Sequence, residues 1–103
     1  MIIFKQSVIQ YLDELVLVLY INEYFGYIES AELFVDKLTD YINEHIITFP
    51  ARKTPLKIKY LGSKYMFYKS NQRTTWYIFF EQKDTNFVIT NIINSNSKEV
   101  KWL

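Results

Sequence analysis

The spacing of apolar residues changes once along the chain, and this change constrains the fold more than any other feature. Both prolines fall at the change, in residues 48–55. Before this segment, apolar residues recur every three or four positions, which is typical of amphipathic helices. After it, aromatic and β-branched residues gather in residues 64–69, 75–81 and 87–93, which indicates strands. The sequence therefore predicts an α+β protein.

Two helices are predicted before the break. The first begins at Ser7, whose hydroxyl can form a capping box with the glutamine three residues later. It ends near Phe25, where Gly26 can take the left-handed conformation of a helix C-terminus. The second begins at Glu29 or Ser30. Because the link between them is short, the two helices are expected to fold back as a hairpin.

One domain spanning residues 1–103 is predicted, since a chain of 103 residues with half of them apolar can bury one core but not two. A short strand in residues 1–6 precedes the helical hairpin. Turn-forming residues separate the three later strands. We therefore expect an N-terminal strand, a helical hairpin and then a three-stranded antiparallel sheet, with the helices covering one face.

The sequence lacks the residues that several kinds of chemistry require. The chain has no cysteine and one histidine, His45, so it lacks a zinc ligand set and we interpret His45 as a helix-end residue. Its two glycines cannot form a glycine-rich phosphate loop. No apolar run approaches the length of a membrane span and no leader pattern is present. A cytoplasmic protein without metal, cofactor or membrane partner is expected.

Charge is divided unequally between the two halves. Residues 1–50 hold two lysines and eight acids, a net charge of −6. Residues 51–103 hold ten basic residues and three acids, a net charge of +7. Most of the acids lie on the polar faces of the predicted helices, where a solvated surface accounts for them. The basic half predicts an anionic partner.

The basic residues are interleaved with aromatic ones. Seven basic residues and no acid fall between Arg52 and Arg73. Lys57 and Lys59 alternate with apolar residues, which predicts an extended segment with both lysines on one side. Cations that neutralise phosphate beside rings that stack on bases are typical of single-stranded RNA recognition. The predicted nucleic-acid contacts are Lys57, Lys59, Lys64, Tyr65, Tyr68 and Trp76. The alternative is a sheet edge that lysines protect from aggregation.

Four segments resemble the RelE/ParE superfamily of bacterial toxins. They are NQRTTWYIFF at residues 71–80, VITNIIN at 88–94, YFGYIESA at 24–31 and LGS at 61–63. The resemblance implies the cytoplasmic toxin of a type II toxin–antitoxin system, neutralised by a cognate antitoxin whose extended segment wraps it. Ribonuclease members cleave messenger RNA on the ribosome without metal, using lysine and arginine. ParE-like members instead poison DNA gyrase.

The chain departs from the ribonuclease pattern in two places. Ribonuclease members carry a basic pair on the first strand of the C-terminal sheet, at positions that here hold Tyr65 and Phe67. They carry an arginine and a tyrosine near the chain end, where this sequence has Asn91, Asn94, Asn96 and Lys98. Lys69 and Arg73 remain as catalytic candidates that would stabilise the phosphate transition state. The hypotheses are ribosome-dependent mRNA cleavage, binding of gyrase or another target without cleavage, and an inactive regulatory domain.

Overall fold

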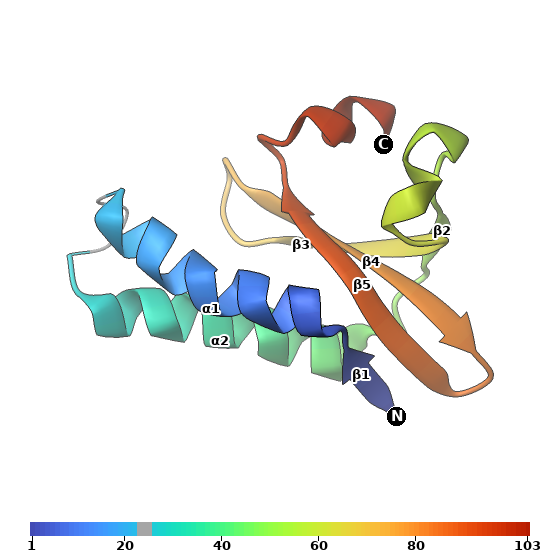
Figure 1. Cartoon of the computed structure of the whole chain (residues 1–103), viewed down its shortest axis with the longest axis horizontal. Helices are drawn as coiled ribbons and strands as arrows, with labels where there is room; N and C mark the ends of the chain where they lie inside the picture. The colour runs from blue at the N-terminus through green and yellow to red at the C-terminus, as the bar shows by residue number, and fades with distance from the viewer. Residues whose placement is uncertain (23–25) are drawn as a thin grey trace.

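The protein is a β-sheet that lies between a pair of long helices and two short ones (Figure 1). The computed structural model describes residues 1–22 and 26–103. In chain order the elements are β1 (Ile2–Phe4), α1 (Gln6–Ile21), α2 (Ile28–His45), β2 (Arg52–Lys53), η1 (Leu56–Leu61), β3 (Lys64–Lys69), β4 (Thr75–Lys83), β5 (Asn86–Asn94) and η2 (Lys98–Trp102). Helices α1 and α2 lie side by side against one face, and η1 and η2 lie on the other side (Figure 1). The expected α+β class is confirmed.

The sheet has five strands in the order β1-β5-β4-β3-β2, whereas the sequence predicted three. Strands β3, β4 and β5 pair antiparallel, as expected. The N-terminal strand joins as a parallel edge, with Ile2 opposite Phe87, and β2 joins as an antiparallel edge, with Arg52 opposite Tyr65. The added strands have three residues and two residues. Strands this short show no two-residue period, so the sequence pattern did not place them in the sheet.

The main core lies between the sheet and the two long helices. Met66, Ile78 and Phe80 project from β3 and β4 toward the helices, where they pack with Leu38 and Ile42 of α2. All five side chains are fully buried. The two-residue alternation of β3 and β4 matches this face, since successive side chains of a strand point to opposite sides. The helical spacing of the α2 residues likewise places them on one stripe.

A second, smaller core occupies the other face of the sheet. Tyr65 of β3 and Phe79 of β4 project to this side and pack with Ile58 and Leu61 of η1. Phe67, Tyr77, Ile93 and Leu103 pack against this core and remain partly exposed. This face is therefore only partly covered.

The helix ends differ from the predicted ones. Helix α1 begins at Gln6 with Lys5 at the N-cap, and no side chain caps it, so the capping box predicted for Ser7 does not form. The Lys5 carbonyl instead accepts hydrogen bonds from the backbone N–H groups of Val8 and Ile9. The helix ends at Ile21, and the C-terminus predicted near Phe25 lies outside the described residues. Helix α2 begins at Ile28, close to the predicted start.

The segment predicted to be extended around Lys57 and Lys59 is the 3₁₀ helix η1. The segment is kinked at Ile58, whose φ of −124° and ψ of 19° are not helical. Its buried residues, Ile58 and Leu61, both pack against Tyr65 and Phe79 of the sheet. The two lysines therefore do not share a face by strand alternation. Because the segment is short, the two-residue apolar period of a strand and the three-residue apolar period of a 3₁₀ helix are difficult to distinguish in its sequence.

A bulge in β5 fixes η1 onto the sheet. Phe79 pairs with Asn91 and the next residue of β4 pairs with Ile89, so Thr90 is the extra residue. The Thr90 hydroxyl and the Asn91 side-chain amide both donate hydrogen bonds to the carbonyl of Leu61, at 2.6 and 2.8 Å. The C-terminal end of η1 is thus held directly above the sheet.

Candidate aromatic and basic site on the sheet

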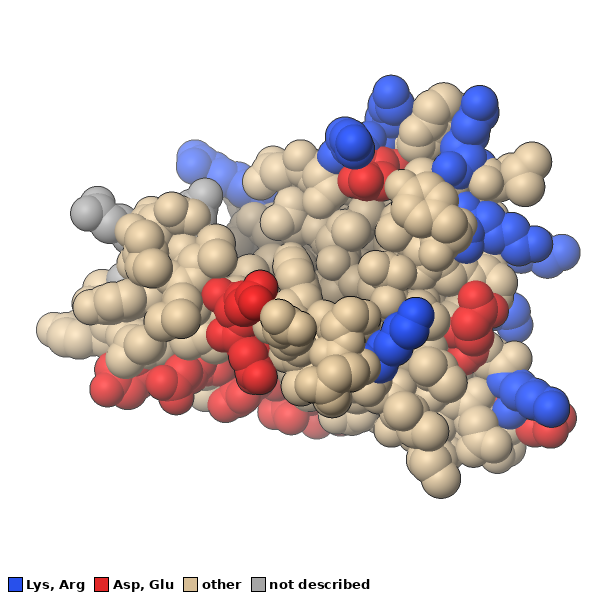
Figure 2. Space-filling view, viewed as in Figure 1, with Lys and Arg blue, Asp and Glu red and all other residues tan. Residues whose placement is uncertain are grey.

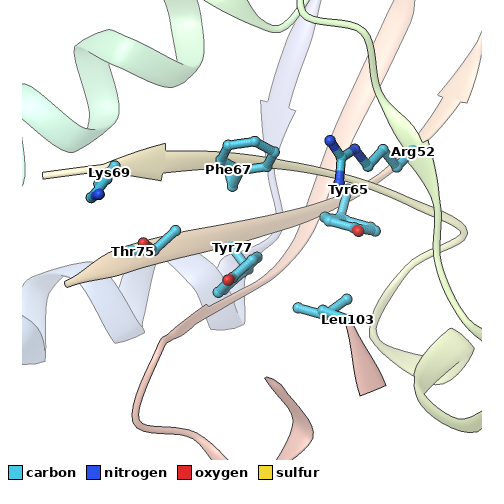
Figure 3. Close-up of a pocket in the computed structure, with 7 residues that line it drawn as sticks. All are labelled: Arg52, Tyr65, Phe67, Lys69, Thr75, Tyr77 and Leu103. Carbon is cyan, nitrogen blue, oxygen red and sulfur yellow. The ribbon is translucent and has the colours of Figure 1, made fainter. Parts of the chain in front are cut away.

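A cavity of about 280 Å³ opens on the face of the sheet opposite α1 and α2 (Figure 3). Its lining combines two basic side chains, three aromatic rings, one hydroxyl side chain and one aliphatic side chain. These residues are Arg52, Lys69, Tyr65, Phe67, Tyr77, Thr75 and Leu103. We call this set the aromatic–basic site.

The strand register brings the lining residues together. Tyr65, Phe67 and Lys69 are alternate residues of β3, so they project from one face of the sheet. On the neighbouring strand, Tyr77 lies directly opposite Phe67, and Thr75 lies directly opposite Lys69. The edge strand β2 then places Arg52 opposite Tyr65. Regular strand pairing therefore brings together six of the seven lining residues from three strands, and Leu103, which follows η2, completes the site.

The aromatic rings form a tilted surface along the cavity. The ring centroids of Phe67 and Tyr77 are 6.4 Å apart, and those of Tyr65 and Tyr77 are 6.3 Å apart. The Phe49 ring meets Phe67 edge-on at 5.1 Å and so supports it from the side. The Arg52 guanidinium lies 5.4 Å from the Phe67 ring centroid, within the range of a cation–π contact. Phe67 and Tyr77 stay partly exposed and can contact a ligand.

The positive charge of the site is not neutralised by the protein. Within residues 1–22 and 26–103, no lysine or arginine forms an ion pair with a carboxylate, and the only pair involving an acid joins His45 to Glu44. No acid lines the cavity. Figure 2 shows most acids grouped over the helices and most basic residues over the end that carries η1, η2 and the sheet edge. The acidic first half and the basic second half of the sequence thus also carry their charges on different regions of the molecule.

The predicted site residues are divided between this cavity and other places. Lys69 lines the aromatic–basic site, and Tyr65 lines it as a wall with only 6% of its surface exposed. Trp76 is 2% exposed on the opposite face and donates a hydrogen bond to the Ser70 hydroxyl at 3.2 Å. Tyr68 also faces the helices, where its ring stacks on Tyr41 at 4.3 Å. Burial corrects the expectation that Tyr65 and Trp76 offer free faces for bases.

The other predicted contacts lie around the site. Arg73, the catalytic candidate predicted together with Lys69, is exposed in the turn between β3 and β4 and is not among the residues lining the cavity. The structure therefore does not bring it into the aromatic–basic site. Lys57 lies 5.5 Å from the ring centroid of Trp102, in a cavity between η1 and η2. Lys59 and Lys64 line a third cavity at the sheet edge.

Sequence reasoning did not assign Arg52, Phe67, Thr75, Tyr77 or Leu103 to a site. The alternation within β3 and β4 contained part of the signal, because it places Phe67 on the same side as Lys69. Arg52 joins the site through the pairing of β2 with β3. A strand of two residues is too short to show a pattern from which this pairing could be predicted.

The site offers positively charged groups, aromatic rings and hydroxyl groups to a ligand. Among its lining side chains there is neither an imidazole nor a carboxylate. Within the described part of the chain, no group of three or more histidine, cysteine, aspartate or glutamate residues is placed to hold a metal ion. Such a site can bind an anion and stack against a planar group.

No family model, curated protein or solved structure matches the chain. Within residues 1–22 and 26–103, no helix combines the length and the apolar character that crossing a membrane requires. Function is therefore inferred from the chemistry and position of the site.

Proposed function

We propose that this chain is a RelE/ParE-type toxin of a bacterial type II toxin–antitoxin system and that it stops translation by binding messenger RNA at the aromatic–basic site. One observation carries the proposal. Arg52 and Lys69 form no ion pair with any residue that the structure describes, and they lie at a surface of aromatic rings on the partly covered face of the sheet.

The spacing of the two cations suits an extended polyanion. Arg52 lies opposite Tyr65, and Lys69 lies four residues further along β3. Four residues of strand separate the backbone positions of Tyr65 and Lys69 by about 13 Å. The Arg52 guanidinium reaches over the Phe67 ring between them, so both cations can contact phosphates of one nucleic-acid strand. Phe67 and Tyr77 lie between them and can stack against a base. This arrangement combines charge neutralisation with base stacking, as single-stranded RNA recognition requires.

Cleavage is the reaction that the resemblance implies. In it, the ribose 2′-oxygen forms a bond to phosphorus while the bond to the 5′-oxygen breaks, and the leaving oxygen gains a proton. Arg52 can stabilise the added negative charge on the phosphate, and the Lys69 ammonium can donate that proton. The 2′-hydroxyl proton would pass to water in this scheme, because no histidine or carboxylate lines the cavity.

Target binding without cleavage is a second candidate function, and it is favoured by the aromatic side chains of Tyr65 and Phe67 at the two positions where the ribonuclease pattern has a basic pair. In that case the site would contact DNA gyrase, as in ParE-like members, or another target. In both cases we expect a cognate antitoxin with an acidic or amphipathic segment to cover the basic face and neutralise the toxin.

Incorporation of labelled amino acid and labelled thymidine after induction of the protein separates the candidates. We expect a prompt fall in amino acid incorporation while thymidine incorporation continues, and we expect Arg52→Gln to remove the effect. Arg73→Gln is the matched control because it removes an arginine outside the cavity. A fall in thymidine incorporation alone would support the gyrase function, and no change in either would leave an inactive regulatory domain.

A further inference from the structure

A second basic cavity, of about 320 Å³, lies at the edge of the sheet. Its lining residues are Lys53, Thr54, Leu56, Lys59, Ser63 and Lys64. The three lysines come from β2, η1 and β3. This lysine cavity shares no lining residue with the aromatic–basic site.

Thr54 lines this cavity, and its hydroxyl oxygen is buried and has no hydrogen-bond partner within residues 1–22 and 26–103. The residue is 8% exposed, and its backbone N–H donates to the Ser63 carbonyl at 3.0 Å, so the backbone holds the side chain in place. An unsatisfied buried hydroxyl is unfavourable and uncommon in native proteins. The oxygen is inaccessible to solvent in this structure, so an oxygen acceptor in the cavity satisfies it only after a small shift of the Thr54 side chain.

The lysines of the cavity retain most of their capacity to donate hydrogen bonds. The Lys64 ammonium donates to the Gln82 side-chain oxygen at 3.4 Å, which leaves two of its three N–H groups. No ion pair is formed by Lys53 or Lys59 within the described residues. The acid nearby, Glu81, already accepts hydrogen bonds from the backbone N–H and the hydroxyl of Ser63.

We propose that the lysine cavity is a phosphate-binding site. The Thr54 hydroxyl donates a hydrogen bond to one phosphate oxygen, and the ammonium groups of Lys53, Lys59 and Lys64 supply the opposite charge. Phosphate suits this set because it offers several strong acceptor oxygens to donors that carry no acceptor of their own. The phosphate can belong to a nucleic-acid backbone or to a free phosphate ion.

The neighbouring position of the two cavities favours a backbone phosphate. Arg52 and Lys53 are consecutive residues of β2, and the first lines the aromatic–basic site while the second lines the lysine cavity. Consecutive residues of a strand point to opposite sides, but β2 is the edge of the sheet, so a single RNA strand that passes around this edge can contact both. This extension to RNA rests on the proposed function, whereas phosphate binding itself does not.

Titration of the full chain with inorganic phosphate at constant ionic strength, followed by the NMR shifts of the Thr54 and Ser63 amides, tests the site. Saturable shifts are expected. Thr54→Val should weaken phosphate binding about fivefold, the effect of one hydrogen bond, while Thr54→Ser keeps the hydroxyl and the affinity. Lys59→Gln should weaken it at least about tenfold. Lys37→Gln on α2 removes the same charge elsewhere and should have no effect.

Shifts that do not saturate, or equal affinity in Thr54→Val and the wild type, would overturn the site. Binding of decauridylate by the same variants then identifies the source of the phosphate. A loss of RNA affinity in Lys59→Gln supports a backbone phosphate. If Arg52→Gln loses RNA affinity and Lys59→Gln does not, the extension to RNA is wrong while the proposed function stands. If inorganic phosphate binds and the wild type binds no RNA, the phosphate site stands and the proposed function fails.

Discussion

The guanidinium carbon of Arg52 lies 5.4 Å from the ring centroid of Phe67, across the antiparallel pair of β2 and β3. This contact holds a cation beside a partly exposed ring at the mouth of the aromatic–basic site. The Phe49 ring supports Phe67 from the side at 5.1 Å. Arginine is suited to this position because its planar group can stack on a ring and still donate a forked pair of hydrogen bonds to phosphate.

Arg52→Gln should lower the affinity for a single-stranded RNA such as decauridylate by at least about tenfold, as expected for loss of a charge-assisted hydrogen bond. Fluorescence anisotropy at fixed ionic strength measures the change. Arg73→Gln carries the same loss of charge in the turn between β3 and β4, outside the cavity, and should weaken binding much less. Equal losses in the two variants would mean that binding depends on net charge and not on the site.

Gly62→Ala should destabilise the fold by about 1–3 kcal/mol, the range for strained backbone conformations. Gly62 has a φ of 154°, and an added Cβ would lie 2.5 Å from the Thr90 hydroxyl oxygen and 2.9 Å from the Cβ of Phe79. Urea unfolding measures the difference. Gly26→Ala is the control, since a Cβ there meets nothing within 4 Å, and it should change stability by no more than about 0.5 kcal/mol. Similar effects at both glycines would contradict the close approach at Gly62.

Leu38→Ala should cost about 2–5 kcal/mol, because the side chain is 0% exposed between α2 and the sheet and its removal leaves a cavity. Leu33→Ala on the same helix removes a side chain that is 56% exposed and should change stability by less than about 1 kcal/mol. The melting temperatures of the two variants provide the comparison. A larger loss of stability for Leu33→Ala than for Leu38→Ala would contradict the assignment of Leu38 to the buried face of α2.

Stability should fall in alkaline solution through Tyr41. Burial, and secondly the neighbouring Tyr68, raise the pKa of the Tyr41 phenol above its ordinary value. The unfolded phenol ionises near pH 10 while the folded one stays neutral, so its contribution is complete below that pH and is lost as pH rises through the folded pKa. Urea unfolding between pH 8 and 11 should show a shallower decline in Tyr41→Phe than in the wild type. Identical declines would contradict this role for Tyr41.

The sequence predicted the regular elements well where their apolar pattern was long enough. The predicted strand at residues 64–69 has the same bounds in the structure, and the two helices lie close to their predicted positions. The pairing of β1 with β5 was not predictable, because three residues carry no periodic signal and their partners lie more than 80 residues away.

The candidate site was only partly predictable for the same reason. Lys69 was identified from its charge, and it lines the cavity. Trp76 is an apolar neighbour of basic residues in sequence, but strand alternation places it on the buried face. The side-chain amide of Asn91 donates a hydrogen bond to the Leu61 carbonyl. Such a tertiary hydrogen bond has no sequence signature.

Inhibition of a cell-free bacterial translation reaction by the purified protein tests the central claim most directly. The wild type and Arg73→Gln should stop translation at similar concentrations. Arg52→Gln, if equally folded by circular dichroism, should require at least about tenfold more protein, because it lacks the charge-assisted contact to phosphate at the aromatic–basic site. Translation that continues with excess wild-type protein, or equal potency of wild type and Arg52→Gln, would contradict the account.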